Sequence, residues 1–93
     1  MAEEFTAQLS MRDGRWRLYV VLLNTTERWP DHLFSHTVPT FTERTDALSL
    51  LGFEPVPGAE WTWTEDSENP DDPASPAVLI AAVRVRSWAE ADA

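Results

Sequence analysis

Residues 4–24 read EFTAQLSMRDGRWRLYVVLLN, two runs of alternating apolar and polar residues on either side of Asp13 and Gly14. This dipeptide favours a two-residue type I′ turn, because both central residues of that turn need a positive φ. Closing the turn fixes a register that gathers the apolar residues of both runs on one face. That register sets Met11 opposite Trp16, Leu9 opposite Leu18, Ala7 opposite Val20 and Phe5 opposite Leu22. The stretch predicts a β-hairpin with strands at about 5–12 and 15–23.

The second face of this hairpin differs between the two strands. The first strand is polar there, as expected of an edge strand. The second is apolar on both faces toward its end, as expected of a central strand. Such an apolar back needs a cover, which the segment 24–39, Trp88 or a second copy of the protein could supply. The residues expected on this back face and homodimer surface are Tyr19, Val21, Leu23 and Ile80.

The segment TFTERTDALSLLGFEPVP predicts one helix over residues 41–51. Thr40 and Glu43 fit a capping box, in which each side chain bonds the backbone N–H of the other residue. Gly52 fits the position just after the helix, where a positive φ is common.

Two further strands are expected at about 59–65 and 77–87, where AEWTWTE and AVLIAAVRVRS carry alternating or continuous apolar residues. One antiparallel register sets Trp61 opposite Val85, Trp63 opposite Val83 and Glu60 opposite Arg86. The segment 24–39 holds two prolines and no sustained period, which indicates an ordered connection. The order β-β-α-β-β therefore predicts an α+β fold in one domain, 1–93, with a four-stranded, mostly antiparallel sheet and one helix packed on one face.

The tryptophans fall into two groups by position. Trp16, Trp61 and Trp63 lie on the apolar faces of expected strands, so we expect them in the core. The sequence leaves open whether Trp29 and Trp88 belong to the core or to an interface.

The composition is strongly acidic, with 16 Asp and Glu against seven basic residues, all of them Arg, and a net charge of −9. Such a chain repels phosphate backbones, which disfavours direct nucleic-acid binding and leaves a basic protein partner or simple solubility as explanations. There is no cysteine for a disulfide or a thiolate site. The N-terminal residues lack the apolar region of a secretory signal, and AVLIAAV at 77–83 is too short to span a bilayer. We therefore expect a soluble cytoplasmic protein.

The segment WTWTEDSENPDDPASP, residues 61–76, joins a tryptophan-rich strand to an acidic loop expected at 65–76. Its carboxylates are Glu65, Asp66, Glu68, Asp71 and Asp72. A calcium loop would need a turn glycine that this segment lacks. The remaining interpretations are a docking surface for a basic partner, a mimic of nucleic-acid phosphates, or a solvated hairpin loop that discourages edge-to-edge aggregation.

The search for catalytic and metal-binding patterns yields no strong candidate. His32 and His36 are four residues apart, a spacing that suits a metal only on a helix, and their segment lacks helical periodicity. Each of the three glycines fits a turn or a cap rather than a phosphate loop, and no serine stands in a nucleophile motif. The sequence therefore predicts no catalytic residue, no metal, no cofactor and no enzymatic activity.

Three quoted stretches carry a resemblance that covers most of the chain. FTAQLSM…GRWRLYVVL, TERTDALSLLGFEPVPGAEWTWTEDSE and PDDPASPAVLIAAVRVR together resemble a family of small uncharacterised proteins from Streptomyces and related actinobacteria. That family has no known function, so the resemblance implies a host and a single domain but transfers no site residue. YVVLLN…RWP, within 19–30, is also similar to MbtH-like proteins, which chaperone adenylation domains of peptide synthetases. Glu27 stands where those proteins carry a serine.

The sequence as a whole favours a small non-enzymatic accessory or regulatory protein that acts through protein–protein interaction. The alternative hypothesis is an acidic nucleic-acid mimic that inhibits a DNA- or RNA-binding protein, such as one carried by a mobile element. The residues expected to contact a partner in either case are the five carboxylates at 65–72.

Overall fold

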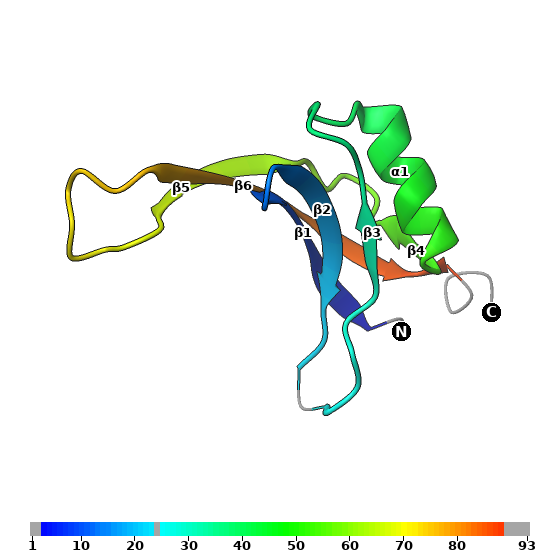
Figure 1. Ribbon diagram of the computed structural model, residues 1–93. Coiled ribbons are helices and arrows are strands. Elements are labelled where there is room, and N and C mark those ends of the chain that lie inside the picture. The colour runs from blue at the N-terminus through cyan, green and yellow to red at the C-terminus, as the bar shows by residue number, and fades with distance from the viewer. Residues whose placement is uncertain (1–2, 24, 89–93) are drawn as a thin grey trace.

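The computed structural model describes residues 3–23 and 25–88, and over these residues the chain forms six strands and one helix. The elements are β1 (Glu4–Arg12), β2 (Arg15–Val21), β3 (Asp31–Leu33), α1 (Phe41–Leu50), β4 (Phe53–Pro55), β5 (Thr62–Ser67) and β6 (Ala77–Ser87). Figure 1 shows the strands curling into an open half-barrel with α1 across one side. The α+β class fits, but the prediction of a four-stranded sheet is wrong.

The β1–β2 hairpin has the predicted turn and register. Asp13 and Gly14 hold φ values of 53° and 78°, as a type I′ turn requires. The pairs Met11 with Trp16, Leu9 with Leu18 and Ala7 with Val20 are confirmed. All of these except Met11 are buried, so the inner face of the hairpin forms much of the core.

The position of β1 in the sheet differs from the prediction. The strand order is β3-β2-β1-β6-β4, so β1 is a central strand rather than an edge. The prediction of an edge strand was based on the polar back of β1, but the polarity of a face depends on what covers that face. It does not report whether both hydrogen-bonding sides of the strand are occupied.

Two short strands occupy the edge of β6 where one was expected. Pro55 of β4 pairs with Val85, whereas Thr62 of β5 pairs with Ala82, so the chain between β4 and β5 loops out of the sheet. The strand expected at about 59–65 is present as β5 at 62–67 and pairs antiparallel with β6, but the expected register is wrong, because Trp63 lies opposite Ala81 rather than Val83. Glu54, not Glu60, faces Arg86. β3, inside the expected connection, is the other added strand.

The helix packs its buried side on the inner face of the sheet. The capping box is present: Glu43 N–H donates to Thr40 Oγ1 at 3.2 Å, and Thr40 N–H donates to Glu43 Oε1 at 3.1 Å. Ala47 and Leu48 are fully or almost fully buried against the sheet. The helix begins where predicted and ends at Leu50, one residue before the predicted end, and Gly52 follows with a φ of 93°.

The β5–β6 hairpin extends past the rest of the sheet. β1 pairs with β6 only over Ile80–Arg86, so residues 77–79 of β6 and their β5 partners have no third strand beside them. We call residues 65–79 the arm. Figure 1 shows the arm projecting from the body to the left, with its turn at the far end. In the part of the chain that the structure describes, no helix is long and apolar enough to cross a membrane.

Candidate functional site

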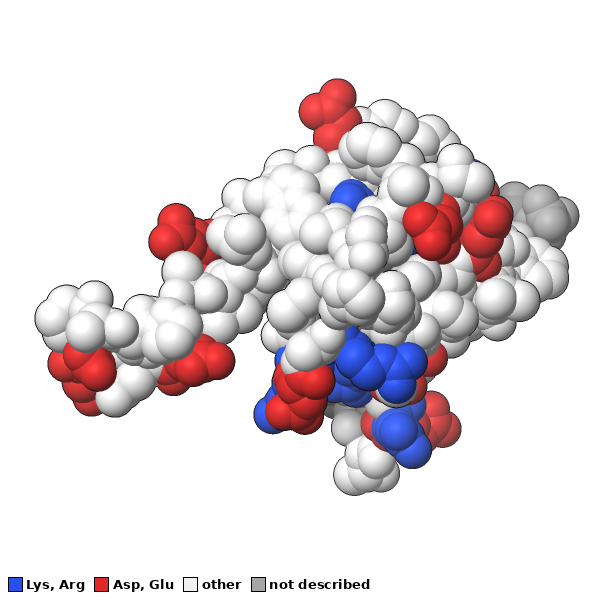
Figure 2. Space-filling model, turned by 45° about the horizontal axis from the view of Figure 1, so that its top comes forward, with Lys and Arg blue, Asp and Glu red and all other residues white. Residues whose placement is uncertain are grey.

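The five carboxylates singled out in the sequence all lie on the arm. Glu65 and Asp66 belong to β5, and Glu68, Asp71 and Asp72 belong to the turn beyond it, so the loop begins later than predicted. All five side chains are exposed. Figure 2 shows acidic side chains along the projecting arm, well separated from the body.

The turn of the arm is ordered by its own hydrogen bonds. Asn69 N–H donates to Ser75 Oγ at 2.9 Å, and Glu68 N–H donates to the Pro76 carbonyl at 3.2 Å. Asp72 Oδ1 accepts from Ala74 N–H at 2.9 Å, as in an Asx turn. Short polar side chains thus hold the turn in place. The carboxylates of Glu65, Glu68 and Asp71 make no hydrogen bond or ion pair with any residue that the structure describes.

The arginines of the described chain lie outside the arm, and Arg12 at the end of β1 lines the same hollow as Glu68. Arg17 pairs with Asp31 at 2.9 Å, and Arg86 with Glu54 at 3.3 Å, between Nε and a carboxylate oxygen in each case. The sequence from 45 to 83 contains no arginine or lysine. In Figure 2 the blue side chains gather on the body, with red side chains among them. The arm therefore carries a negative field that no residue of the arm itself neutralises.

An apolar groove lies at the root of the arm, between the β1–β2 turn and β6. It has a volume of about 490 Å³, and its lining includes the apolar residues Met11, Trp16, Val78 and Leu79 and the charged residues Arg12, Asp13 and Glu68. Met11 and Leu79 are 40% and 50% exposed. Large apolar side chains next to free carboxylates give a surface that suits a partner with both basic and apolar groups.

The expected dimer residues share the back of the sheet but do not form one apolar patch. Tyr19 stacks on Trp29 with ring centroids 6.1 Å apart, and its hydroxyl donates to Gln8 Oε1 at 2.7 Å. Ile80 lies on β6, and the polar back of β1 separates it from the β2 residues. Val21 is half-buried and Leu23, 78% exposed, follows the end of β2. Trp29, within the segment 25–39, thus supplies part of the cover.

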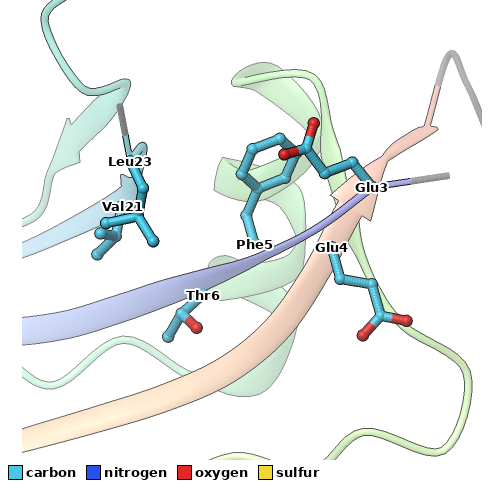
Figure 3. A pocket seen from close by; sticks show the side chains of 6 residues that line it. All are labelled: Glu3, Glu4, Phe5, Thr6, Val21 and Leu23. Carbon is cyan, nitrogen blue, oxygen red and sulfur yellow. The ribbon is translucent and has the colours of Figure 1, made fainter. Parts of the chain in front are cut away.

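A small hollow of about 220 Å³ lies where β1 begins, lined by Glu3, Glu4, Phe5, Thr6, Val21 and Leu23. Figure 3 shows the side chains of Glu3 and Glu4 extending to opposite sides of β1. The two carboxylates therefore do not converge on one point in the hollow, as paired catalytic acids would.

The histidines do not share a helix. His32 lies in β3 opposite Leu18, with its ring 4.7 Å from that of Phe34, and His36 is exposed in the following bend. Within residues 3–23 and 25–88, no three His, Asp or Glu side chains come close enough to hold a metal ion together.

A buried arginine in an aromatic box was not foreseen. Arg44 is 6% exposed, and its guanidinium carbon lies 5.0 Å, 5.2 Å and 5.6 Å from the ring centroids of Phe41, Trp61 and Trp63. Arg44 Nε donates to the Pro39 carbonyl at 2.9 Å. Burial lowers the pKa of Arg44 below its usual range.

The same box corrects the expectation for the tryptophans. Trp16 is buried as expected, with its ring edge-on to Trp63 at 5.9 Å. Trp61 is half-buried, and Trp63 is 45% exposed and is not a core residue. Helical spacing could have found Arg44, because it lies three and four residues before the buried pair Ala47 and Leu48.

Comparison with known proteins gives one match. A family model described as "Family of unknown function (DUF6303)" matches residues 3–93. No curated protein and no solved structure matches the chain.

Proposed function

We propose that this chain, which belongs to the DUF6303 family, is a non-enzymatic accessory or regulatory protein that binds a basic protein partner in the cytoplasm through its arm. The observation that carries the proposal is the arm itself. It projects from the body, bears five exposed carboxylates and has no basic residue of its own. The homodimer expected from the sequence stays a prediction, and sedimentation as a monomer at micromolar concentration would remove it.

Electrostatics and packing give the arm complementary roles. Unneutralised carboxylates on a projecting element raise the rate at which a basic partner approaches and orient it. The groove at the root then offers exposed apolar side chains, among them Met11 and Leu79, as anchors that hold the partner once it arrives. Charge alone would give fast but weak binding, so the groove supplies the longer residence.

The second candidate is an acidic mimic of nucleic acid. It is favoured by the same row of carboxylates, which the turn holds in place through its internal hydrogen bonds. A mimic would occupy the nucleic-acid site of its partner. DNA or RNA would then displace the protein from the captured partner, whereas an accessory protein bound elsewhere would stay.

Capture from a Streptomyces lysate tests the proposal, since the sequence resemblance implies an actinobacterial host. One variant neutralises the arm with E65Q, D66N, E68Q, D71N and D72N. A matched control neutralises five exposed acids outside the arm and the groove with E3Q, E4Q, E27Q, D46N and E60Q. Both variants lose five negative charges, so we expect the arm variant to lose the captured protein and the control to keep it. Equal capture by both variants would show that the arm is not the binding site.

A further inference from the structure

The outer edge of β5 is open. β5 pairs with β6, and no other described strand is hydrogen-bonded to it. Five of its six residues are exposed, the exception being Ser67. An unpaired strand edge presents backbone donors and acceptors that another extended chain can use.

The backbone groups that face outward can be identified from neighbouring hydrogen bonds. Thr62 Oγ1 lies 3.5 Å from the carbonyl oxygen of Ala82, and Thr64 Oγ1 lies 3.4 Å from that of Ile80. Those β6 carbonyls therefore face β5. Val56 N–H donates to the Arg84 carbonyl at 2.9 Å, which continues the same alternation along β6.

The alternation determines the free groups of β5. In an antiparallel pair, a residue opposite such a carbonyl hydrogen-bonds the partner strand through both its backbone N–H and its C=O. The backbone groups of the residues in between point away from the partner strand, toward the open edge. Thr62, Thr64 and Asp66 thus bond β6, whereas the backbone N–H and C=O of Trp63 and Glu65 face outward. The next outward N–H, that of Ser67, is taken by Asp66 Oδ1 at 2.8 Å.

We propose that the β5 edge accepts an extended basic segment of the partner as an added antiparallel strand, bonded to the backbones of Trp63 and Glu65. The inference rests on the proposed function and names how the arm would bind. It concerns the backbone edge, whereas the proposed function concerns the charges, so the two can fail separately.

The two faces of β5 define the segment that fits. Trp63 and Glu65 point to one face, and Thr62, Thr64 and Asp66 to the other. A lysine or arginine opposite Glu65 would gain an ion pair, and one near Trp63 would lie against an exposed ring. On the other face, β-branched residues pair well with Thr62 and Thr64. The matching pattern alternates basic and β-branched residues.

A second copy of this chain fits the edge poorly. Antiparallel pairing of two β5 strands would lay two acidic arms side by side, with no basic residue on either arm to offset the repulsion. The whole chain carries −9, which adds to the repulsion. The charges that oppose self-pairing favour a basic strand.

The test uses a blocked ten-residue peptide of alternating lysine and valine as the probe, with binding measured by calorimetry. Its lysines fall opposite Trp63 and Glu65, so their backbone N–H groups would bond β5. E65P removes one outward donor and one charge, and proline is tolerated where a strand nitrogen faces outward. E65Q removes only the charge. We expect E65Q to weaken binding about threefold and E65P about tenfold or more.

A control peptide carries a methyl group on the backbone nitrogen of each lysine. Its charge is unchanged but it cannot donate to β5, so we expect its binding to fall as far as that of the unmethylated peptide to E65P. Equal binding of both peptides, or equal binding by E65P and E65Q, would overturn the strand-addition proposal. It would leave a charge-based role for the arm in place.

Amide exchange on the unmodified protein gives a result that does not depend on any variant folding. Addition of a strand should protect the amides of Trp63 and Glu65 while leaving those of Thr62, Thr64 and Asp66 unchanged, because the latter already bond β6. Uniform changes along β5, or no binding of the alternating peptide, would also overturn the inference. If the peptide binds in this alternating pattern but the five-charge arm variant still captures its partner, the strand site stands and the proposed charge-based function fails.

Discussion

At the scale of single residues, Arg44 is the least expected feature of the molecule. It lies on the buried side of α1, with three aromatic rings around its guanidinium and no carboxylate among its described contacts. Its Nη1 has no hydrogen-bond partner among the described residues. Removing a cation from water is costly, and here the rings and the Pro39 carbonyl offset that cost.

Substitution of Arg44 separates packing from charge. R44A should lower the free energy of unfolding by about 2–3 kcal/mol, because it leaves a cavity among the rings and removes the cation–π contacts. R44M fills most of the same space without a buried charge and should retain more stability than R44A. Urea unfolding followed by tryptophan fluorescence measures both. If R44M loses as much stability as R44A, the charge itself holds the box together.

Residue patterns explain what could be foreseen at this scale. Thr40, Glu43 and Gly52 have local roles that depend on a few neighbours, and each was predicted from them. Arg44 was missed because its burial depends on Trp61 and Trp63, which are distant in sequence and come close to it only in the folded chain. A charged residue on an apolar helical stripe is a signal, but the sequence does not show which rings face it.

At the scale of elements, the β5–β6 hairpin that carries the arm offers two surfaces to a partner, a strand edge and a turn. The edge is β5 with its outward backbone groups at Trp63 and Glu65. The turn, 68–76, holds the remaining three carboxylates. Neither part contributes a residue to the buried core, which lies in the body.

Replacing residues 67–77 with Asn-Gly tests this division. Asp66 and Val78 face each other in the hairpin and, by the alternation above, form a hydrogen-bonded pair, so a two-residue turn can join them directly. The free energy of unfolding should change by less than about 1 kcal/mol, since shortening an exposed loop has a small entropic effect. The lysine–valine peptide should still bind, more weakly because three charges are gone. Loss of all binding would place the contact in the turn instead of the edge.

The elements also show where sequence patterns reach their limit. The β1–β2 hairpin was predicted with its register because its turn and its alternation agree over adjacent residues. The strand beside β6 was misplaced because the loop between β4 and β5 takes residues out of the sheet. The alternation of apolar and polar residues does not show how many residues leave the sheet between two strands.

At the scale of the whole molecule, the net charge of −9 sets the conditions for binding. Raising the salt concentration from about 0.1 M to about 1 M shortens the screening length from about 10 Å to about 3 Å. The three ion pairs of the described chain are partly or largely exposed and add little to stability. Stability and binding should therefore respond differently to salt.

We expect the dissociation constant of the lysine–valine peptide to rise about tenfold or more over this range of salt, because its attraction to the arm is screened. The melting temperature of the free protein should stay constant or rise slightly, since salt also relieves the repulsion among its own acids. Calorimetry and thermal unfolding at matched salt concentrations check both. Binding that is insensitive to salt would argue against a charge-guided partner.

The hairpin, its turn, the helix start and the acidic segment could all be predicted from the sequence, because each depends on residues close together along the chain. The tertiary structure alone decided that β1 is central, that two strands share the edge of β6, and that the carboxylates stand on a projecting arm. Strand order, loop-outs and overhangs follow from how distant segments pair to bury the core. That pairing is a long-range choice, and the alternation within a single strand is compatible with more than one partner.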